Sequence, residues 1–366
     1  MATRTKCILF SESYGGVQNE LAVHRTLATI PFGGRYRLID FILSSLVNAN
    51  ITDIGILTKE HYGSLSDHIE YGKDWGLDRR DAGLKILTPF AKEESALTRN
   101  RSDVDALLSA KGYVKKGDED YVILADTNLV LNVDFKAMIK SHKNNGADIT
   151  LLYRNVDTPA NGLVIDCDET GKVTDAKFGT SGKMMLKIIV INKELLVSLL
   201  DKAYTYGWTD LTRDFITQHI ETLNVYGFEH KGYSAVINTI ADYYKASMDL
   251  IRTDIRKELF YSEAPILTRV KNSVPTTYGF DSKVKNSLIA DGCEINGELN
   301  NCIVFRGVKI KKGAVLNNCI IMQHTEIGEN ARLNCVITDK DVTVEDNHIL
   351  SGYETYPFVI SKGKTV

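Results

Sequence analysis

Residues 301–333 read NCIVFRGVKIKKGAVLNNCIIMQHTEIGENARL, and this stretch decides the fold of the C-terminal part of the chain. Four short apolar segments begin at Asn286, Asn301, Asn318 and Asn334, so their starts are 15, 17 and 16 residues apart. This degenerate hexapeptide repeat is typical of a parallel β-helix, in which each coil buries its apolar face only by stacking on the next coil. The repeat therefore predicts a β-helix at the end of the chain.

Three cysteines follow the asparagines in this alignment, namely Cys302, Cys319 and Cys335, and we expect them in one column of the stacked coils. We interpret them as small buried thiols that pack like alanine or valine. The alternative is a redox or metal site. It is disfavoured because a column on one wall does not give the tetrahedral convergence that a zinc site needs.

The first 250 residues alternate strand-like and helix-like segments. Residues 6–10 (KCILF) and 121–126 (YVILAD) read as buried strands, and the apolar residues between positions 38 and 47 recur at helical spacing. This alternation predicts an α/β domain with a parallel, doubly wound sheet. Because ligands of such sheets bind at the carboxyl ends of strands, the loops after Phe10 and after Leu124 are the candidate site.

The 366-residue chain has 43% apolar and 25% charged residues and a net charge of −3, which is typical of a soluble globular protein. A slightly acidic chain of this kind argues against nucleic acid as a partner. No apolar run approaches the length of a membrane span, and the six cysteines include no C-x-x-C pair. We therefore expect a cytoplasmic protein with reduced thiols.

The pattern divides the chain into three parts: a nucleotidyltransferase-like domain over residues 1–256, a linker over 257–282 and a β-helix over 283–366. The linker segment contains Pro265 and Pro275 and shows no clear periodicity.

Two further stretches carry a family resemblance. Residues 30–58 (IPFGGRYRLIDFILSSLVNANITDIGILT) and 232–250 (GYSAVINTIADYYKASMDL) resemble motifs of the ADP-glucose pyrophosphorylase family, as does the repeat of residues 301–333. The resemblance covers nearly the whole chain. It implies a GT-A-like (Rossmann-type) nucleotidyltransferase domain, a left-handed parallel β-helix and a tetrameric assembly.

The resemblance also implies a reaction, in which ATP and glucose 1-phosphate give ADP-glucose and pyrophosphate with a magnesium ion. Such chemistry needs a glycine-rich loop for the phosphates, a basic residue for the leaving pyrophosphate and acidic residues for the metal. The chain departs from the family at each of these positions.

The loop of residues 11–21 (SESYGGVQNEL) has no arginine, and only Gly15 and Gly16 remain of its glycines. Leu27 occupies the family's lysine position, and Val236 occupies the position of its second metal-binding aspartate. Asp126 keeps the place of the first metal-binding aspartate and is interpreted as a vestige. Residues 186–188 (Leu-Lys-Ile) replace a Ser-Met-Gly motif, and residues 101–107 (RSDVDAL) replace a block that shapes the base and sugar pocket.

A retained scaffold with lost chemistry favours a regulatory subunit that is inactive or very weak alone. The resemblance implies a mixed tetramer with a catalytic ADP-glucose pyrophosphorylase subunit, in which self-association is a further option. No cofactor is expected for this chain, and magnesium is implied only for the partner.

Two alternatives remain open. The first is a stand-alone nucleotidyltransferase with a divergent loop, for which Arg25, Arg35 or Arg37 would have to supply the missing positive charge. The second is an acyltransferase built on the β-helix, for which His324 is the one histidine inside a clear repeat. A corner histidine on a solvated turn is the interpretation that we favour for His324.

Overall fold

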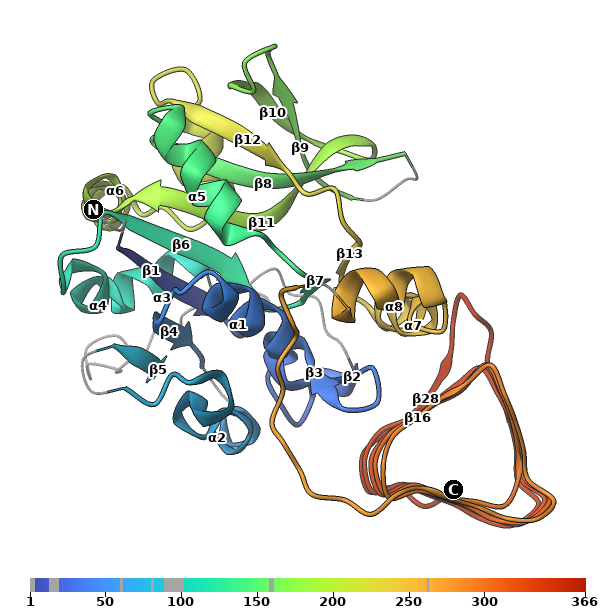
Figure 1. The fold of residues 1–366 in the computed structure, drawn as a ribbon. Coiled ribbons are helices and arrows are strands. Elements are labelled where there is room, and N and C mark those ends of the chain that lie inside the picture. The colour runs from blue at the N-terminus through green and yellow to red at the C-terminus, as the bar shows by residue number, and fades with distance from the viewer. Residues whose placement is uncertain are drawn as a thin grey trace. The chain divides into compact units, whose positions relative to one another are not determined.

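The computed structural model describes residues 4–12, 20–59, 62–79, 82–88, 102–157, 161–261 and 263–366. The chain forms two compact units (Figure 1): unit 1 comprises Met1–Gly16 and Ile42–Ser234, and unit 2 comprises Val17–Phe41 and Ala235–Val366. The sequence-based parts 1–256, 257–282 and 283–366 cut the chain differently, and they stay a prediction about sequence modules. Each unit is described by itself below.

Unit 1 is built on a nine-stranded sheet in the order β10-β9-β11-β6-β1-β4-β5, with β8 pairing β11 and β12. The strands are β1 (Thr5–Phe10), β4 (Asp53–Leu57), β5 (Gly83–Leu87), β6 (Tyr121–Asp126), β8 (Ile149–Val156), β9 (Gly162–Cys167), β10 (Val173–Gly179), β11 (Gly182–Asn192) and β12 (Val225–Glu229). The central strands are continuous apolar runs because helices cover both of their faces.

Helices of unit 1 pack on opposite sides of this sheet (Figure 1). They are α2 (Gly63–Ile69), α3 (Asp103–Ser109), α4 (Lys111–Lys115), α5 (Phe135–Asn144) and α6 (Lys193–Tyr206), and α1 (Leu38–Asn48) runs across the boundary of the two units. Buried side chains of α3, α4 and α6 join one core cluster with Ile8, Val122 and Leu124. Their neighbours along the strands point to the other face, as the two-residue period of a strand requires.

The sheet is mixed rather than parallel throughout, which corrects the sequence-based expectation. Strands β6, β1, β4 and β5 are parallel as predicted, whereas β11 runs antiparallel to both β6 and β8. Strands β9, β10 and β11 follow one another through short turns, and such turns can only join antiparallel neighbours.

Other short elements complete the chain. They are η1 (Glu20–Ala22), η2 (Leu27–Thr29), η3 (Glu70–Trp75), β7 (Leu129–Leu131), η5 (Leu211–Ile216), η6 (Thr217–His219) and β13 (Ser234–Val236). The helix expected over residues 212–223 is instead a π-helical turn, η5, followed by the tighter turn η6.

Unit 2 joins an N-terminal hairpin to two helices and the β-helix. The hairpin consists of β2 (Pro31–Phe32) and β3 (Tyr36–Arg37), and its turn needs the positive φ angles of Gly33 and Gly34. Helices α7 (Ile240–Asp249) and α8 (Thr253–Phe260) follow β13, and a capping box between Thr239 and Asp242 starts α7. Helix α7 then holds the hairpin, because the hydroxyl of its Tyr243 donates to the carbonyl oxygen of Pro31 at 2.7 Å.

The predicted β-helix is confirmed as three parallel five-stranded sheets that wrap one core (Figure 1). Its strands are β14 (Thr277–Tyr278), β15 (Lys283–Lys285), β16 (Leu288–Ile289), β17 (Glu294–Ile295), β18 (Glu298–Asn300), β19 (Ile303–Val304), β20 (Lys309–Ile310), β21 (Val315–Asn317), β22 (Ile320–Ile321), β23 (Glu326–Ile327), β24 (Arg332–Asn334), β25 (Val336–Thr338), β26 (Thr343–Val344), β27 (Ile349–Ser351) and β28 (Phe358–Ile360). The first coil starts inside the predicted linker, at β14.

The register of the coils corrects the expected cysteine column. Asn317 pairs with Asn334 and Ile320 pairs with Ile337, so Cys319 lies level with Val336 and Cys335 lies level with Asn318. Cys335 therefore belongs to the column of Asn286, Asn301 and Asn318, and all four residues have φ between 46° and 54°. The sequence alignment slipped by one residue because it matched asparagine letters, whereas the fold matches left-handed corners.

The asparagine column forms a hydrogen-bonded ladder. Asn286 Nδ2 donates to Asn301 Oδ1 at 2.6 Å, and Asn301 Nδ2 donates to Asn318 Oδ1 at 3.1 Å. Asparagine suits these corners because its short polar side chain tolerates the left-handed conformation. Cys335 is the position at which the ladder loses its amide.

A buried ion pair holds the N-terminal segment of unit 2 to the β-helix. The guanidinium of Arg25 lies 2.9 Å from each carboxylate oxygen of Asp339, and both side chains are at most 4% exposed. Arg25 Nη1 also donates to the carbonyl oxygen of Leu21. Paired in this way, two charges that would be costly to bury apart stabilise the packing of residues 20–41 on the last coils.

We predict that Asp339→Asn destabilises unit 2 by about 3–5 kcal/mol, because the substitution leaves the buried guanidinium of Arg25 without a counter-charge. Urea unfolding followed by circular dichroism measures the loss. The matched control is Asp341→Asn, whose half-exposed carboxylate lies 4.0 Å from Lys362 and should contribute less than about 1 kcal/mol. Equal losses for the two variants would contradict the assignment.

We also predict that Cys335→Asn stabilises the β-helix by about 1 kcal/mol, because asparagine relieves the left-handed backbone and extends the ladder. Cys319→Asn should cost about 1–3 kcal/mol, because Cys319 faces the apolar core, where an amide lacks partners. Unfolding free energies of the two variants measure the difference, and a reversed order would restore the single cysteine column.

Candidate functional site

Asp126 ends β6 at the carboxyl edge of the sheet of unit 1. Its backbone lies level with Phe10, the last residue of the neighbouring parallel strand β1. The hydroxyl of Thr127 donates to the carbonyl oxygen of Phe10 at 2.8 Å and ties the two strand ends together. The two predicted loops therefore start side by side, at the edge where ligands of such sheets bind.

A lysine from the antiparallel strand β11 reaches this aspartate. The ammonium group of Lys187 lies 3.5 Å from Asp126 Oδ2. Lys187 sits where the pairing of β11 with β8 shifts, between Met185 and Ile189, and its φ of 50° is unusual for a residue other than glycine. The sequence showed that Lys187 stands in a replaced motif, but the side-chain contact depends on this bulge and was not predicted.

Two further aspartates lie near the same lysine. Asp103 begins α3 and accepts hydrogen bonds from the backbone N–H groups of Val104 at 2.8 Å and Leu211 at 3.1 Å. Asp210 caps η5 by accepting from the N–H of Arg213. Because the carboxylates of Asp126, Asp103 and Asp210 all raise the pKa of Lys187, the lysine is surrounded by negative charge from three elements.

Burial controls how the two aspartates of this site titrate. Burial raises the pKa of Asp126, and the nearby ammonium of Lys187 partly offsets that rise. For Asp103, burial raises the pKa to about 6, with Asp210 adding to the rise and the hydrogen bond from Leu211 opposing it. The edge therefore holds acidic groups that the chain itself compensates.

The residues present do not fit a magnesium ion. Magnesium requires oxygen ligands in near-octahedral geometry, usually including one or two carboxylates. Over the described residues, no three histidine, cysteine, aspartate or glutamate side chains converge on one point. The ammonium group that contacts Asp126 would in addition repel a divalent cation.

The other predicted site positions lie elsewhere. Leu27 is buried in unit 2 at the start of η2, and Val236 is half-buried at the end of β13. Neither side chain carries the charge that the family chemistry needs at its position. Gly15 and Gly16, the predicted remnant of the phosphate loop, lie outside the described residues.

The three candidate arginines have different environments in unit 2. Arg25 is committed to Asp339, and Arg35 is exposed beside the ring of Tyr36. Arg37 belongs to a group of cations in which burial, Arg37 and Arg25 lower the pKa of Lys340 to about 7. Burial, Arg269 and Arg37 likewise lower the pKa of Lys271. An anion bound beside these side chains would relieve their mutual repulsion.

His324 lies on an exposed corner of the β-helix, where its φ is 60°. This placement confirms the interpretation of a corner histidine. The buried thiols of Cys302 and Cys319 donate to backbone carbonyl oxygens, and the six cysteines form no disulfide. Burial also raises the pKa of Cys319 well above its usual value, so its thiol is a packing group rather than a nucleophile.

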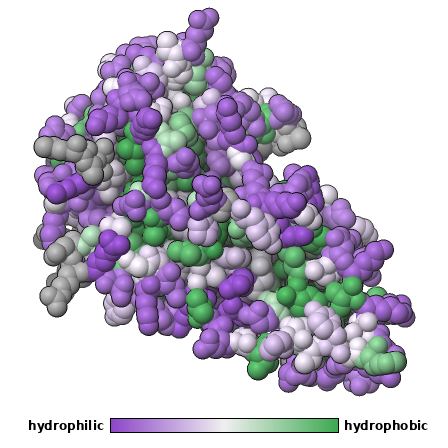
Figure 2. All heavy atoms as spheres, in the orientation of Figure 1, coloured by the Kyte–Doolittle hydropathy of each residue, from purple (hydrophilic) through white to green (hydrophobic). Residues whose placement is uncertain are grey.

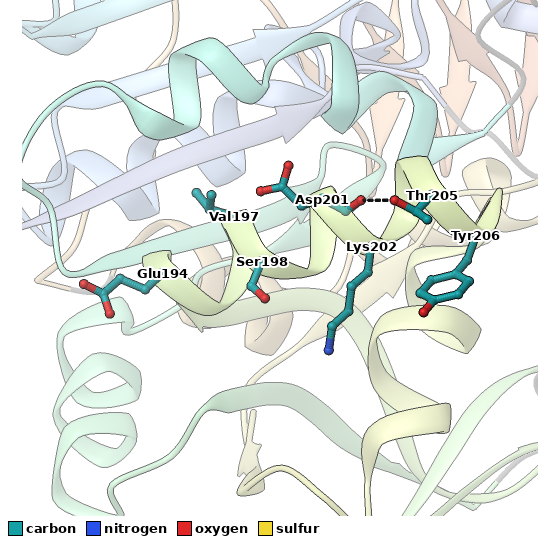
Figure 3. A pocket seen from close by; sticks show the side chains of 7 residues that line it. All are labelled: Glu194, Val197, Ser198, Asp201, Lys202, Thr205 and Tyr206. Atoms are coloured by element: carbon teal, nitrogen blue, oxygen red, sulfur yellow. Dashed lines mark hydrogen bonds between the residues drawn. The ribbon is translucent and has the colours of Figure 1, made fainter.

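A hollow along the outer side of α6 does not resemble an active site. It is lined by Glu194, Val197, Ser198, Asp201, Lys202, Thr205 and Tyr206 (Figure 3). All seven side chains come from this one helix, and the hydroxyl of Thr205 bonds only back to the carbonyl oxygen of Asp201. A binding site needs polar groups that converge from several elements, and this hollow lacks them.

The surface of the β-helix carries exposed apolar side chains. Among them are Phe280, Val284, Ile349 and Phe358. Figure 2 shows hydrophobic atoms gathered on part of the β-helix face that it displays. Gathered apolar exposure on a soluble unit is typical of a surface that contacts another protein.

Comparison with known proteins gives matches to both parts of the chain. A model of nucleotidyl transferases matches residues 21–177, and a model of GlmU-like C-terminal hexapeptide regions matches residues 272–354. The glycogen biosynthesis protein GlgD of Bacillus subtilis is 35% identical over 97% of this chain and 95% of its own length. GlgD of Geobacillus stearothermophilus is 34% identical with the same coverage.

The glucose-1-phosphate adenylyltransferase of Thermosipho melanesiensis is 30% identical over 78% of this chain and 71% of its own length. The chain belongs to the ADP-glucose pyrophosphorylase family. Its nucleotidyltransferase α/β sheet and its hexapeptide β-helix are therefore the two parts of that family's fold. The left-handed sense of the β-helix stays a prediction from the resemblance.

Within this family, the chain keeps the scaffold and changes the charged positions. Asp126 is retained but contacts Lys187, and apolar residues stand at positions 27 and 236. Of the helices that the structure describes, none combines the length and apolarity that crossing a membrane requires.

We predict that Asp103 makes the stability of the protein depend on pH between about 4 and about 6. As pH rises, the unfolded chain loses this proton near its ordinary pKa of 3.8, whereas the folded chain keeps it until about 6. Stability therefore falls across this window, by at most about 3 kcal/mol, and is level above it. Asp103→Asn should flatten the curve of unfolding free energy against pH. The control, Asp105→Asn on the same helix, should leave the wild-type slope, and an unchanged slope in both variants would contradict the prediction.

Proposed function

We propose that this chain is a regulatory, largely non-catalytic subunit of the glucose-1-phosphate adenylyltransferase of glycogen biosynthesis. Its partner is the catalytic subunit, which joins ATP and glucose 1-phosphate to give ADP-glucose and pyrophosphate. The two chains form a mixed tetramer in the cytoplasm, and this chain sets the rate or substrate affinity of its partner.

The observation that carries this proposal is the contact between Lys187 and Asp126. Asp126 is the one acidic residue that the chain retains at a metal-binding position of the family. With the ammonium of Lys187 at 3.5 Å, this carboxylate is already compensated from within the chain. Phosphoryl transfer relies on cations that neutralise the phosphates, so a site directed at its own lysine is poorly suited to it.

Leu27 and Val236 support the same conclusion through residue type alone. An alkyl side chain neither offsets the charge of a departing pyrophosphate nor holds a metal ion, wherever it lies. Loss of one preorganised charged contact costs about 10²–10³ in rate, and losses within one site do not add independently. Even with that limit, we expect little turnover from the chain alone.

The retained scaffold supports a role in assembly. The Arg25–Asp339 pair, the hairpin held by Tyr243 and the complete β-helix are structural investments without catalytic chemistry. The exposed apolar side chains of the β-helix supply a surface suited to another subunit. The similarity to proteins named GlgD, which extends over nearly the full length, places glycogen biosynthesis ahead of other nucleotide-sugar pathways.

We predict that the purified chain releases no measurable pyrophosphate from ATP and glucose 1-phosphate, because its charged positions are lost or self-compensated. Mixed with the catalytic subunit of the same organism, it should change that subunit's kcat or KM and elute with it in size-exclusion chromatography. A coupled pyrophosphate assay of the chain alone, the partner alone and the mixture measures the effect. The heat-unfolded chain is the control for added protein.

Turnover by the chain alone would favour a stand-alone nucleotidyltransferase instead. Asp126→Asn tests that outcome, with Asp166→Asn as a matched control on the exposed part of β9 in the same unit. Turnover that Asp126→Asn removes and Asp166→Asn leaves intact would overturn the regulatory proposal. Co-elution without any change in partner kinetics would equally overturn it.

A further inference from the structure

The carboxyl edge of unit 1 contains a positive charge that is covalently part of the chain. Asp126 is mostly buried, with 18% of its side chain exposed, and a buried carboxylate is unfavourable unless a cation compensates it. In the structure that cation is Lys187, which approaches from the neighbouring strand β11.

The backbone of β11 is bent in a way that delivers this lysine. Between Met185 and Ile189 the strand advances four residues while its partner β8 advances from Tyr153 to Leu151, only two. Extra residues of this kind form a bulge, and bulges redirect side chains near functional sites. Lys187 also adopts a φ of 50°, a conformation that costs a residue with a Cβ roughly 1–2 kcal/mol. A strained non-glycine residue beside a conserved fold feature calls for a functional explanation.

The surroundings of Lys187 are those of a cation site. Carboxylates from three separate elements, namely Asp126 of β6, Asp103 of α3 and the capping Asp210 of η5, act on its ammonium group. Over half of the lysine side chain is exposed, so its head group lies at the mouth of the edge rather than in the core. A tethered ammonium at that place meets the same carboxylates that a bound divalent ion would meet.

We propose that Lys187 is a built-in replacement for the divalent metal ion at Asp126, so that this edge of unit 1 excludes metal. The ammonium neutralises Asp126 without dissociating, and its charge repels a second cation. The proposal goes beyond the regulatory function and stands without it, because it concerns the isolated chain alone.

Manganese binding to the purified full-length chain tests the proposal, with electron paramagnetic resonance counting bound Mn²⁺. Wild type and Asp126→Asn should bind equally little. Lys187→Gly, which suits the positive φ, should bind a single Mn²⁺ at least about tenfold more tightly than wild type, since the neighbouring positive charge is gone. Lys187→Gly combined with Asp126→Asn should lose that site. Lys177→Gly, which removes an exposed lysine paired with Asp166 on the same sheet, is the matched control and should behave as wild type.

Several outcomes would overturn the proposal. One is Mn²⁺ binding by the wild type that Asp126→Asn abolishes, a comparison that does not depend on any Lys187 variant folding. Another is a folded Lys187→Gly chain, verified by circular dichroism, that gains no Mn²⁺ site. Lys187→Met, which keeps most of the side-chain stem, replaces Lys187→Gly if the glycine variant fails to fold. The pyrophosphate assay is a separate measurement, so failure here leaves the regulatory proposal standing.

Discussion

Unit 2 depends on one buried ion pair, between Arg25 and Asp339. The two residues lie more than three hundred positions apart in the sequence, and both are almost fully buried. A buried guanidinium is tolerated only where a carboxylate meets it with good geometry, so the pair determines where residues 20–41 lie on the last coils of the β-helix. The hairpin, with its turn at Gly33 and Gly34, then packs under α7, and the aromatic rings of Phe32, Phe41 and Tyr243 fill the space between them.

The two units treat charge in a similar way. In unit 1, Lys187 compensates Asp126, and in unit 2, Asp339 compensates Arg25. In an enzyme that handles nucleotides, cationic and anionic side chains of this kind would be directed at phosphates and a metal ion. Here they are directed at one another. What remains unpaired in effect is the group of cations around Lys340, whose lowered pKa reflects an excess of positive charge.

Much of this architecture follows from local sequence pattern. The period of the hexapeptide repeat specified the β-helix, and the alternation of apolar segments specified the α/β unit, because both patterns record which side chains are buried. Three features were not predictable in this way. The level of Cys335 depends on backbone corners rather than residue type, and the Lys187 contact depends on a bulge that no local motif announces. The Arg25–Asp339 pair joins distant positions of a kind that a single sequence does not connect.

The sequence gave better access to what the site lacks than to what it contains. Leu27 and Val236 could be recognised from residue type, since an alkyl group cannot do the work of an ammonium or a carboxylate in any geometry. Asp126 was recognisable as a retained acid at the end of a buried strand. Its partner was not, because β11 was expected as an ordinary strand and its antiparallel placement beside β6 emerges only from the fold.

The left-handed corners of the β-helix have a consequence for how such a unit can change over evolutionary time. Successive coils repeat every 17 residues at the asparagine column after Asn301, and a single inserted or deleted residue would displace every later corner from its column. Length can therefore change without damage only by whole coils, or at a place where the chain leaves the wall. The pairing of Val336 with Phe358, 22 residues further on, marks such a place: the extra residues form the projection that carries Tyr353 and Tyr356. New contacts can arise there while the wall itself stays fixed in length.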